Sequence, residues 1–561
     1  MKRKTLLSVV ALSATATLPF TASASTFAEQ DSLKTHRLEE VQVTATRASA
    51  RTPMSFSNLS KAQLQKANLG LDVPYLLLQT PSVVATSEPG IGIGYTYLRV
   101  RGVDAAGINI MTNGVPLNDS ESQGVFWANM PNFSSSIQDA QLQRGVGTSS
   151  NGSAAFGASL NLRTDHFSMT PTATLSLLGG AYNTFRREVH ASTGRIAEHW
   201  ALEARLGKTT TDGYIDRSGT EGTSYFLQGG YFGENTILKL LSFGGKQRTG
   251  IAWNGLSATE EATYGRRYNS AGHMNPKSTP ADARYRYNTD NYEQNHLQAQ
   301  LTQRLSEGLV LNLTAHYTQG YGFTDEYRTG RKLKEYGLKE FILRGADGQA
   351  ILDKDGKEQK VKKITLLRTK YLDNDFYGGI ATLEYKAHRL ELTTGLSANH
   401  YVGDHYGERT PITPYPYQVE PNERYYEDRA HKTDLSGFTK ATFEVARGLN
   451  LFADLQYRFI DYRIKGSIDH FTGGKQQQMD LKKTFSFFNP KAGLFYQFAP
   501  QHHVYGSVAV AHREPNRKHY TEVSEAQYPR AERLTDYELG YGFRSRTFTA
   551  GLNLYYMDYK D

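Results

Sequence analysis

Residues 449–459 decide the fold class, and they read LNLFADLQYRF. From Leu449 onward every second residue is apolar, and most of the residues between them are polar or charged. A repeat of two is typical of a β-strand that faces two different environments. The stretches 309–318 and 547–556 show the same alternation, and about fifteen such segments follow Thr172. We therefore expect a large β-sheet in this part of the chain.

The lengths of these segments and of their connections distinguish a membrane barrel from a soluble β-sandwich. Each segment has about ten residues, the length that a tilted strand needs to cross a bilayer. Tight turns alternate with long polar loops, as in outer-membrane barrels, whose long loops face out of the cell. The turns are Glu234-Asn235, residues 306–308, Ala387-His388, Arg447-Gly448 and Ser545-Arg546, and the loops are residues 244–293, 320–375 and 400–434. We predict a transmembrane antiparallel β-barrel.

The composition of the 561 residues agrees with this prediction. Only 39% are hydrophobic and no long apolar stretch follows the first residues, which excludes a bundle of membrane-spanning helices. Aromatic residues make up 12% and suit the girdles of a barrel. Cysteine is absent, which excludes disulfides, cysteine nucleophiles and thiolate metal sites. The net charge of +8 is spread beside 56 acidic residues, so we expect no nucleic-acid partner.

The first 24 residues have the features of a secretory signal peptide. Residues 2–4 are basic, residues 6–20 form an apolar run, and Ala22-Ser23-Ala24 provides a cleavage site. A membrane anchor is the alternative, but the run is too short to span a bilayer. We expect the mature chain to begin at Ser25.

Residues 40–165 break the barrel pattern with more glycine turns and shorter, mixed elements. Gly145 and Gly147 suggest a phosphate loop, but no Lys-Ser or Lys-Thr pair follows, so this enzyme motif is excluded. Four short motifs occur in order: LRVRG at 98–102, NGVPLND at 113–119, QRGVG at 143–147 and FGASLNL at 156–162.

These motifs resemble the plug domain of TonB-dependent outer-membrane receptors, and the resemblance covers nearly all of the chain after the signal peptide. It implies an α+β plug at residues 48–165 in the lumen of a barrel at residues 166–561, which has twenty-two strands in the family. Beyond the plug, the chain resembles the Bacteroidetes branch of the family. The supporting stretches are residues 124–127, 212–217, 488–491 and 532–541.

Residues 25–47 are expected to be a periplasmic leader that contains the coupling segment. The stretch 38–47, LEEVQVTATR, resembles a TonB box, a short β-prone segment that adds as a strand to the sheet of a partner. The resemblance implies that TonB, with its proton-driven inner-membrane complex, pulls on this segment. From the residues alone, an ordinary first strand of the plug is equally open. The candidate coupling residues are Glu40, Val41, Gln42, Val43, Thr44 and Ala45.

The resemblance also implies contacts between plug and wall. Arg101 and Arg144 match plug arginines that pair with wall glutamates in the family, and Glu538 matches one of those glutamates. A charge in a partly dry lumen needs a partner. The alternative is that both arginines are local charges of the plug. The second wall glutamate is expected in a strand beyond position 561.

About fifteen strands are too few for a closed barrel of this family, and bacterial barrels have even numbers of strands. An open edge in lipid leaves backbone groups unpaired. We therefore expect that the chain is truncated at its C-terminus and that about seven strands would follow. A fragment without transport activity is an alternative.

The expected activity is TonB-dependent import of a scarce ligand, such as a ferric siderophore or another iron complex. Loops rich in tyrosine, arginine and histidine suit an anionic chelate, although solvated surface loops have the same composition. Haem and cobalamin remain alternatives, and His512 is either a haem ligand or an isolated histidine. The candidate ligand-binding residues are Arg266, Tyr268, Tyr287, His405 and His512.

Other functional classes fit less well. A passive porin has no plug, and a signal-transducing receptor carries an extra domain before its TonB box. No nucleophile triad, metal cluster or pair of carboxylates indicates an enzyme or a permanently bound cofactor. We expect a monomer in the outer membrane, in contact with lipid and lipopolysaccharide, with its plug and TonB box facing the periplasm.

Overall fold

The computed structural model describes residues 46–561 except 152–155, 275–283 and 473–474. The expected signal peptide and coupling segment therefore lie outside the described residues. The described residues belong to one compact unit. None of the helices in this part of the chain has the length and apolar character needed to cross a bilayer.

The N-terminal part is a small α+β domain, which is the expected plug. Its five-stranded sheet has the order β1-β6-β7-β4-β5, in which only β4 and β7 run parallel, and β2 pairs with β3 in a separate hairpin. The elements are β1 (Phe56–Leu59), α1 (Lys61–Ala67), α2 (Val73–Leu76), β2 (Val83–Ser87), β3 (Thr96–Val100), β4 (Ile108–Thr112), β5 (Val115–Pro116), β6 (Ile137–Arg144) and β7 (Ala158–Thr164). Its short 3₁₀ helices are η1 (Ala105–Gly107), η2 (Trp127–Asn129), η3 (Phe133–Ser136) and η4 (Ser149–Asn151).

The plug has its own apolar core, formed by residues of β3, β4, β6 and β7. Helix α1 begins with a capping box between Ser60 and Gln63, which satisfies two backbone N–H groups of its first turn. The core continues across to the wall, where Phe133 of the plug stacks on Phe243 at a ring distance of 5.1 Å. Burial of apolar surface therefore joins the plug to the strands around it.

The C-terminal part is one antiparallel sheet of fifteen strands in sequence order, from β8 at one edge to β24 at the other. The strand number expected from the sequence is confirmed. The strands are β8 (Thr172–Gly180), β9 (Thr184–Ile196), β10 (Trp200–Thr211), β11 (Thr220–Phe232), β12 (Thr236–Gly250), β13 (Thr289–Ser306), β14 (Leu309–Lys332), β17 (Lys363–Lys386), β18 (Leu390–Pro411), β19 (Arg424–Ala446), β20 (Leu449–Thr472), β21 (Lys475–Ala499), β22 (His502–Arg513), β23 (Glu532–Arg544) and β24 (Thr549–Lys560).

The connections of this sheet carry the remaining elements. The hairpin β15 (Phe341–Ile342) and β16 (Lys360–Val361) lies between β14 and β17, and α3 (Ala258–Tyr264) lies between β12 and β13. The connection from β22 to β23 contains α4 (Lys518–Thr521) and η6 (Glu525–Gln527), and η5 (Leu333–Tyr336) follows β14.

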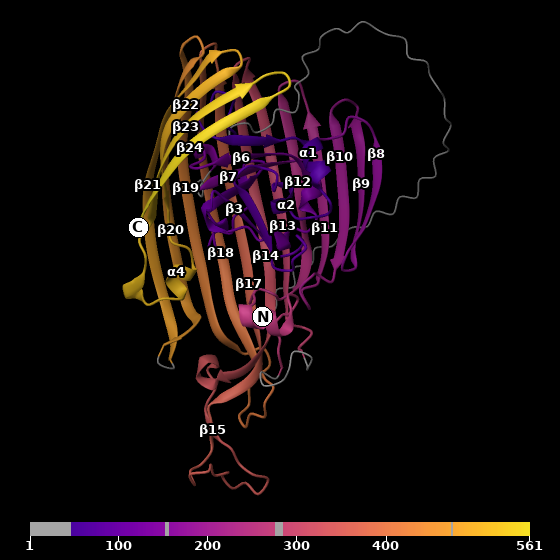
Figure 1. The fold of residues 1–561 in the computed structure, drawn as a ribbon, viewed down its shortest axis with the longest axis vertical. Coiled ribbons are helices and arrows are strands. Elements are labelled where there is room, and N and C mark those ends of the chain that lie inside the picture. Colours follow the sequence, from indigo (N-terminus) through magenta and orange to yellow (C-terminus); the bar gives the residue numbers. More distant parts are fainter. Residues whose placement is uncertain (1–45, 152–155, 275–283, 473–474) are drawn as a thin grey trace, which may run out of the picture. The chain divides into compact units, whose positions relative to one another are not determined.

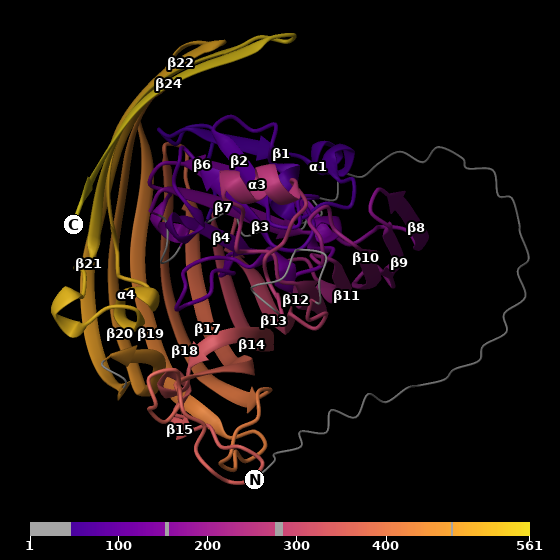
Figure 2. The same ribbon diagram turned by 60° about the horizontal axis from the view of Figure 1, so that its bottom comes forward.

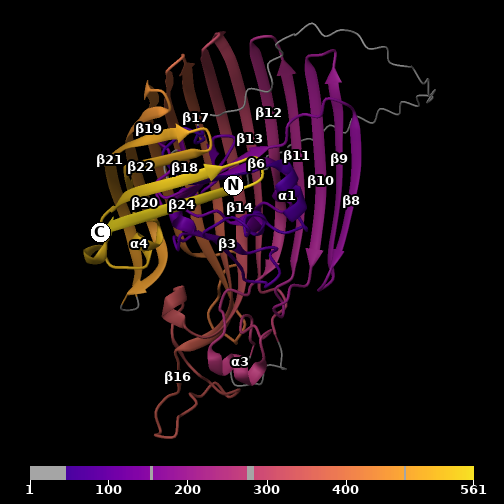
Figure 3. The same ribbon diagram turned by 45° about the horizontal axis from the view of Figure 1, so that its top comes forward.

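Alternation along the strands separates an inner from an outer face. In β12, Leu238 and Leu240 are 46% and 62% exposed, whereas Lys239 and Leu241, which alternate with them, are buried against the plug. Figures 1 and 2 show the sheet curving round the plug, which lies on its concave side. Figure 3 shows the short turns at one end of the strands and α3 and β16 beyond the other end.

Several strands are longer than the sequence pattern suggested. Strands β14, β17 and β20 have 24 residues each, so the expected length of about ten residues is wrong for them. The predicted loops also start before the strands end, since β12 continues to Gly250, β14 to Lys332 and β18 to Pro411. The apolar alternation marks only the part of a strand with an apolar outer face, but backbone pairing continues beyond it. The positions of the tight turns agree with the expectation.

Candidate functional site

Arg101 joins the plug to the wall. It follows β3 with φ of 50°, and its Nη1 lies 2.6 Å from Oε1 of Glu538 in β23. Its Nη2 donates to Asn553 in β24 at 2.5 Å, and its guanidinium stacks 3.9 Å from the ring centre of Tyr555. The Arg101 and Glu538 side chains are 1% and 4% exposed. Removing either member would leave an unpaired buried charge.

Arg144 forms its hydrogen bonds within the plug, so the wall contact expected for it stays a prediction. Its guanidinium donates to the Pro81 carbonyl, Ser55 Oγ and Ser57 Oγ, all within the plug. Burial and the neighbouring Arg101 lower the pKa of Arg144, and Glu538 opposes this shift. The charge of Glu538 on the wall therefore acts on Arg144 electrostatically, while the hydrogen bonds of Arg144 connect segments of the plug.

Two wall aspartates that the sequence did not single out also hold the plug. Asp536 in β23 accepts from the backbone N–H of Val146 at 3.0 Å, and Asp454 in β20 accepts from that of Ser149 at 2.8 Å. Val146 belongs to the QRGVG motif, and Ser149 lies two residues after it. Side-chain acceptors on the wall thus replace the sheet partners that this turn lacks.

The carboxylate of Glu121 in the plug contacts four side chains of the wall and its connections. Its Oε1 accepts from Tyr462 and Arg517 at 2.7 and 2.9 Å, and its Oε2 contacts His405 and Tyr401 at 2.6 and 3.1 Å. Burial opposes ionisation, but Arg517 and His405 hold the pKa of Glu121 well below its usual range. We call this group the Glu121 anchor. The sequence offered no signal for it, because its members come from four separated segments.

The connection between β22 and β23 completes the anchor from the wall side. Arg517 also binds Asp428 at 2.6 Å, and its backbone N–H donates to the Glu121 carbonyl. Lys432 of β19 bridges the Ser120 carbonyl and Glu514 at 2.7 and 2.6 Å. The plug segment 119–124, which we call the outer turn, is therefore held between strands and a folded connection.

The outer turn also borders a cavity of about 260 Å³ between the plug and the strands β13, β14, β17, β18 and β19. Four of its aromatic lining residues are Tyr95, Phe126, Tyr292 and Tyr426, and its charged lining residues are Asp119, Asp290, Lys370 and His405. We call it the outer-turn cavity. Concave sites with many apolar groups and a few polar ones are typical of small-molecule binding.

Among the five sequence candidates for ligand binding, His405 lines this cavity, and it does so from strand β18 and not from a loop. The other four lie elsewhere. Arg266 and Tyr268 follow α3, where Tyr268 packs 4.6 Å from Tyr264. Tyr287 stacks with the Arg286 guanidinium at 4.6 Å.

His512 has local partners that explain its position. Its ring stacks on Phe487 at 5.3 Å with an angle of 8°, and its Nδ1 contacts Asn489 at 2.8 Å. Within the described residues, no group of three or more histidine, aspartate or glutamate side chains is arranged to hold a metal ion.

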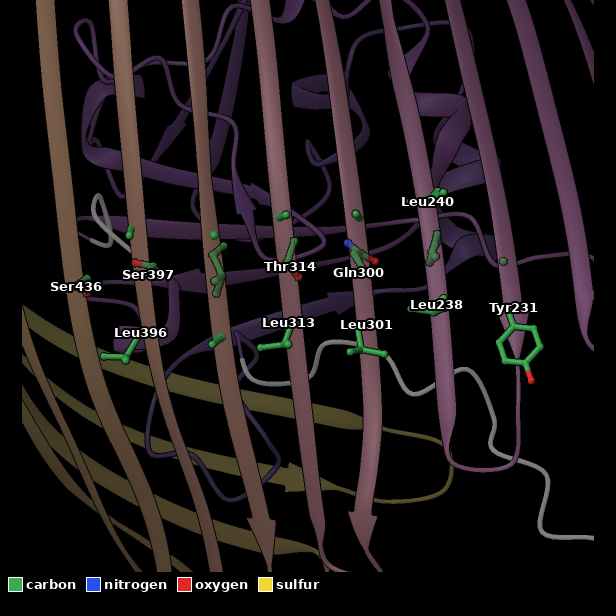
Figure 4. Close-up of a pocket in the computed structure, with 18 of the residues that line it drawn as sticks. Tyr231, Leu238, Leu240, Gln300, Leu301, Leu313, Thr314, Leu396, Ser397 and Ser436 are labelled. Atoms are coloured by element: carbon green, nitrogen blue, oxygen red, sulfur yellow. The ribbon is translucent and has the colours of Figure 1, made fainter.

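A hollow of about 1170 Å³ lies on the outer face of the wall (Figure 4). Leu238, Leu301 and Leu313 are paired neighbours on β12, β13 and β14, on the face opposite Lys239. Small residues such as Ala299 and Ala315 line the next row. Such a band suits lipid hydrocarbon and not a polar cargo.

A second gap between plug and wall lies near the short turns. It has a volume of about 550 Å³ and is lined by Arg47, Arg163, Lys386 and Glu391 among others. Arg51 pairs with Glu391 and lies 3.8 Å from Glu444 at its border. The described chain thus enters the plug beside this gap.

Family profiles match both parts of the chain. The profile described as "TonB-dependent Receptor Plug Domain" matches residues 48–159. The profile described as "TonB dependent receptor-like, beta-barrel" matches residues 235–561, more than half of the chain. No curated protein sequence matches significantly.

Solved structures are similar across most of the chain. The ferric yersiniabactin uptake receptor FyuA from Yersinia pestis has 14% identity and a TM-score of 0.67, over 91% of this chain and 72% of that receptor. The unliganded ferric citrate transporter FecA has 11% identity and a TM-score of 0.67, over 90% and 70%. The copper transporter OprC has 13% identity and a TM-score of 0.66, over 91% and 74%. At such identities the likeness concerns the fold.

Proposed function

This chain belongs to the TonB-dependent receptor family, and we propose that it imports a scarce ligand across the outer membrane by work that TonB performs on its plug. The observation that carries the proposal is the way the plug is held. Arg101 and Glu121 are each bound to wall side chains through buried polar contacts. Such contacts keep a resting plug in place beside the apolar contact of Phe133 with Phe243, and they can be exchanged for water when the plug moves.

The coupling step is assigned to residues 40–45, with the short turns of the sheet toward the periplasm. A β-prone segment ahead of the plug can add to a sheet edge of TonB through backbone hydrogen bonds. The gap beside Arg47 supports this assignment, because a pull on the preceding residues acts first on plug contacts that border it.

We propose an iron chelate as the cargo. Receptors for ferric yersiniabactin and ferric citrate are among the similar structures, which supports this class. The outer-turn cavity is the proposed place of contact, since the wall and the plug both contribute to it and a bound ligand would touch both.

Deletion of residues 40–46 tests the coupling in cells. We expect uptake of radioactive iron, supplied as ferric citrate or as ferric catecholates, to fall to the level of a strain without TonB. Deletion of residues 26–32, the same length of leader farther upstream, should retain uptake at equal receptor abundance.

A second measurement tests the coupling independently of the cargo. A peptide of residues 38–47 should bind the periplasmic domain of TonB, and a scrambled peptide of the same composition should not. Equal binding of both peptides, together with unchanged uptake after deletion of residues 40–46, would refute the proposal.

A further inference from the structure

The charges around the outer-turn cavity are unbalanced, and the imbalance indicates what the cavity binds. Asp290 of β13 is 6% exposed, and its Oδ2 accepts from Tyr95 and Gln247 at 2.6 and 2.9 Å. Among the described residues, its Oδ1 has no hydrogen-bond partner. Asp119 of the outer turn accepts from the backbone N–H groups of Glu121 and Ser122. In the part of the chain that the structure describes, neither carboxylate forms an ion pair.

The two basic side chains that line the same cavity are bound to other carboxylates. Lys370 binds Asp469 at 2.8 Å, and His405 contacts Glu121 at 2.6 Å. Both are therefore already matched with a carboxylate. Within the described residues, Asp119 and Asp290 therefore line the cavity without an ion pair, and a buried carboxylate without a cation is costly. The raised pKa of Asp119, caused by burial and the Glu121 charge, agrees with this imbalance.

The aromatic residues of the cavity favour the same kind of ligand. Tyr95, Tyr292 and Tyr426 surround the space, and Phe126 of the plug is 39% exposed beside it. Aromatic faces attract cations, most strongly where water is displaced. Carboxylates and aromatic rings together are a suitable environment for a positively charged group attached to a flat apolar one.

Resting on the import function proposed above, we infer that the outer-turn cavity binds a cationic, aromatic part of the cargo, with Asp119 and Asp290 as its counter-ions. This sign is opposite to that of the anionic chelate expected from the arginine-containing loops. A volume of about 260 Å³ holds a group of two fused rings, so the cavity accepts a portion of a larger ligand or a small ligand whole.

The inference can be tested by fluorescence titration of the purified receptor in detergent. The probes are N-methylquinolinium, a fluorescent aromatic cation, and naphthoate, an anion of similar ring size. We expect the cation to bind at least about tenfold more tightly than the anion, which corresponds to about 1.4 kcal/mol. Equal or tighter binding of naphthoate, or no measurable binding of the cation, would overturn the inference.

Variants locate the binding in the cavity. Asp290→Asn and Asp119→Asn should each weaken binding of N-methylquinolinium by about tenfold, the loss of one counter-ion. Asp373→Asn is the matched control, because Asp373 lies on β17 between the lining residues Leu372 and Asn374 and is itself exposed. The Asp373→Asn variant should bind N-methylquinolinium with the affinity of the unchanged receptor. An equal loss of affinity in all three variants would contradict the assignment.

A change on the plug covers the case in which an aspartate variant does not fold. Phe126→Ala removes an exposed ring and should weaken binding of N-methylquinolinium several-fold. Phe126→Tyr keeps an aromatic ring and should keep the affinity. These titrations contain no TonB. A failure of cation binding therefore refutes the charge class alone, whereas a failure of TonB-dependent uptake refutes the import function alone.

Discussion

At the scale of single residues, Arg101 and Glu538 form a buried ion pair between plug and wall. Both side chains are buried, so the attraction is little screened by solvent. The arginine also binds Asn553 and Tyr555, so strands β23 and β24 meet at one guanidinium.

Arg101→Met should loosen the plug strongly. Loss of one member of a buried pair costs about 3–5 kcal/mol, because the other charge stays buried without a partner. We expect faster hydrogen exchange in residues 96–112, measured by mass spectrometry. Adding Glu538→Met should recover part of the protection, and Lys208→Met, which breaks an exposed pair with Glu221, should change it little.

Asp72 gives the plug a dependence on pH. It is buried before α2 and accepts from Gly94 N–H and Thr96 Oγ1, and burial raises its pKa to about 8. The folded plug therefore holds this proton more tightly than the unfolded chain, in which the pKa of Asp72 has its ordinary value of 3.8. The resulting stabilisation is full below that ordinary value and is lost as the pH rises through about 8.

As the pH rises from about 5 to about 9, we expect the urea concentration at the midpoint of plug unfolding to decrease. The decrease should be smaller in Asp72→Asn. Emission of the buried Trp127 reports the transition when Trp200→Phe and Trp253→Phe remove the other tryptophans. The same decrease in both proteins would show that other groups cause it.

At the scale of elements, the connection from β22 to β23 acts on the plug through Arg517. Its guanidinium holds Glu121 and Asp428, and its backbone N–H holds the outer turn. Arg517→Ala should free this turn. Labelling of Ser122→Cys by a maleimide measures the effect cleanly, because the chain has no other cysteine.

The expected change is at least about tenfold faster labelling, corresponding to about 1.4 kcal/mol of local stability. Arg530→Ala is the control, since Arg530 is exposed in the same connection. If both variants label at the rate of the parent protein, the connection does not restrain the turn.

The elements also show how far sequence reasoning reaches. Alternation from residues such as Leu449 predicted the strands and tight turns, because one face of each strand meets an apolar environment. It did not predict strand ends, since β14 continues to Lys332 where no apolar face is needed. The match of Arg101 with Glu538 came from local motifs. The Glu121 anchor depends on side chains distant in sequence, which no local pattern links.

At the scale of the whole molecule, the plug is attached to the wall at both ends of the strands. The outer turn binds near the long connections, and Arg51 binds Glu391 near the short turns. The two attachments differ in their position along the chain. Arg51 lies close after the proposed coupling segment, and Glu121 lies seventy positions further on. A pull from the N-terminus therefore reaches the Arg51 contacts before the outer turn.

Tethering the plug at Arg51 should consequently block import while leaving ligand binding intact. A receptor with Arg51→Cys and Glu391→Cys, bridged by a bismaleimide that contains a disulfide, should take up no radioactive iron from its ferric cargo. Reduction of the bridge should restore uptake, because it cuts the tether and leaves the modified side chains in place. Each single-cysteine variant treated with the same reagent should transport normally. Full uptake by the bridged receptor would mean that the plug need not move at this end, and that a pull on residues 40–45 is transmitted by another route.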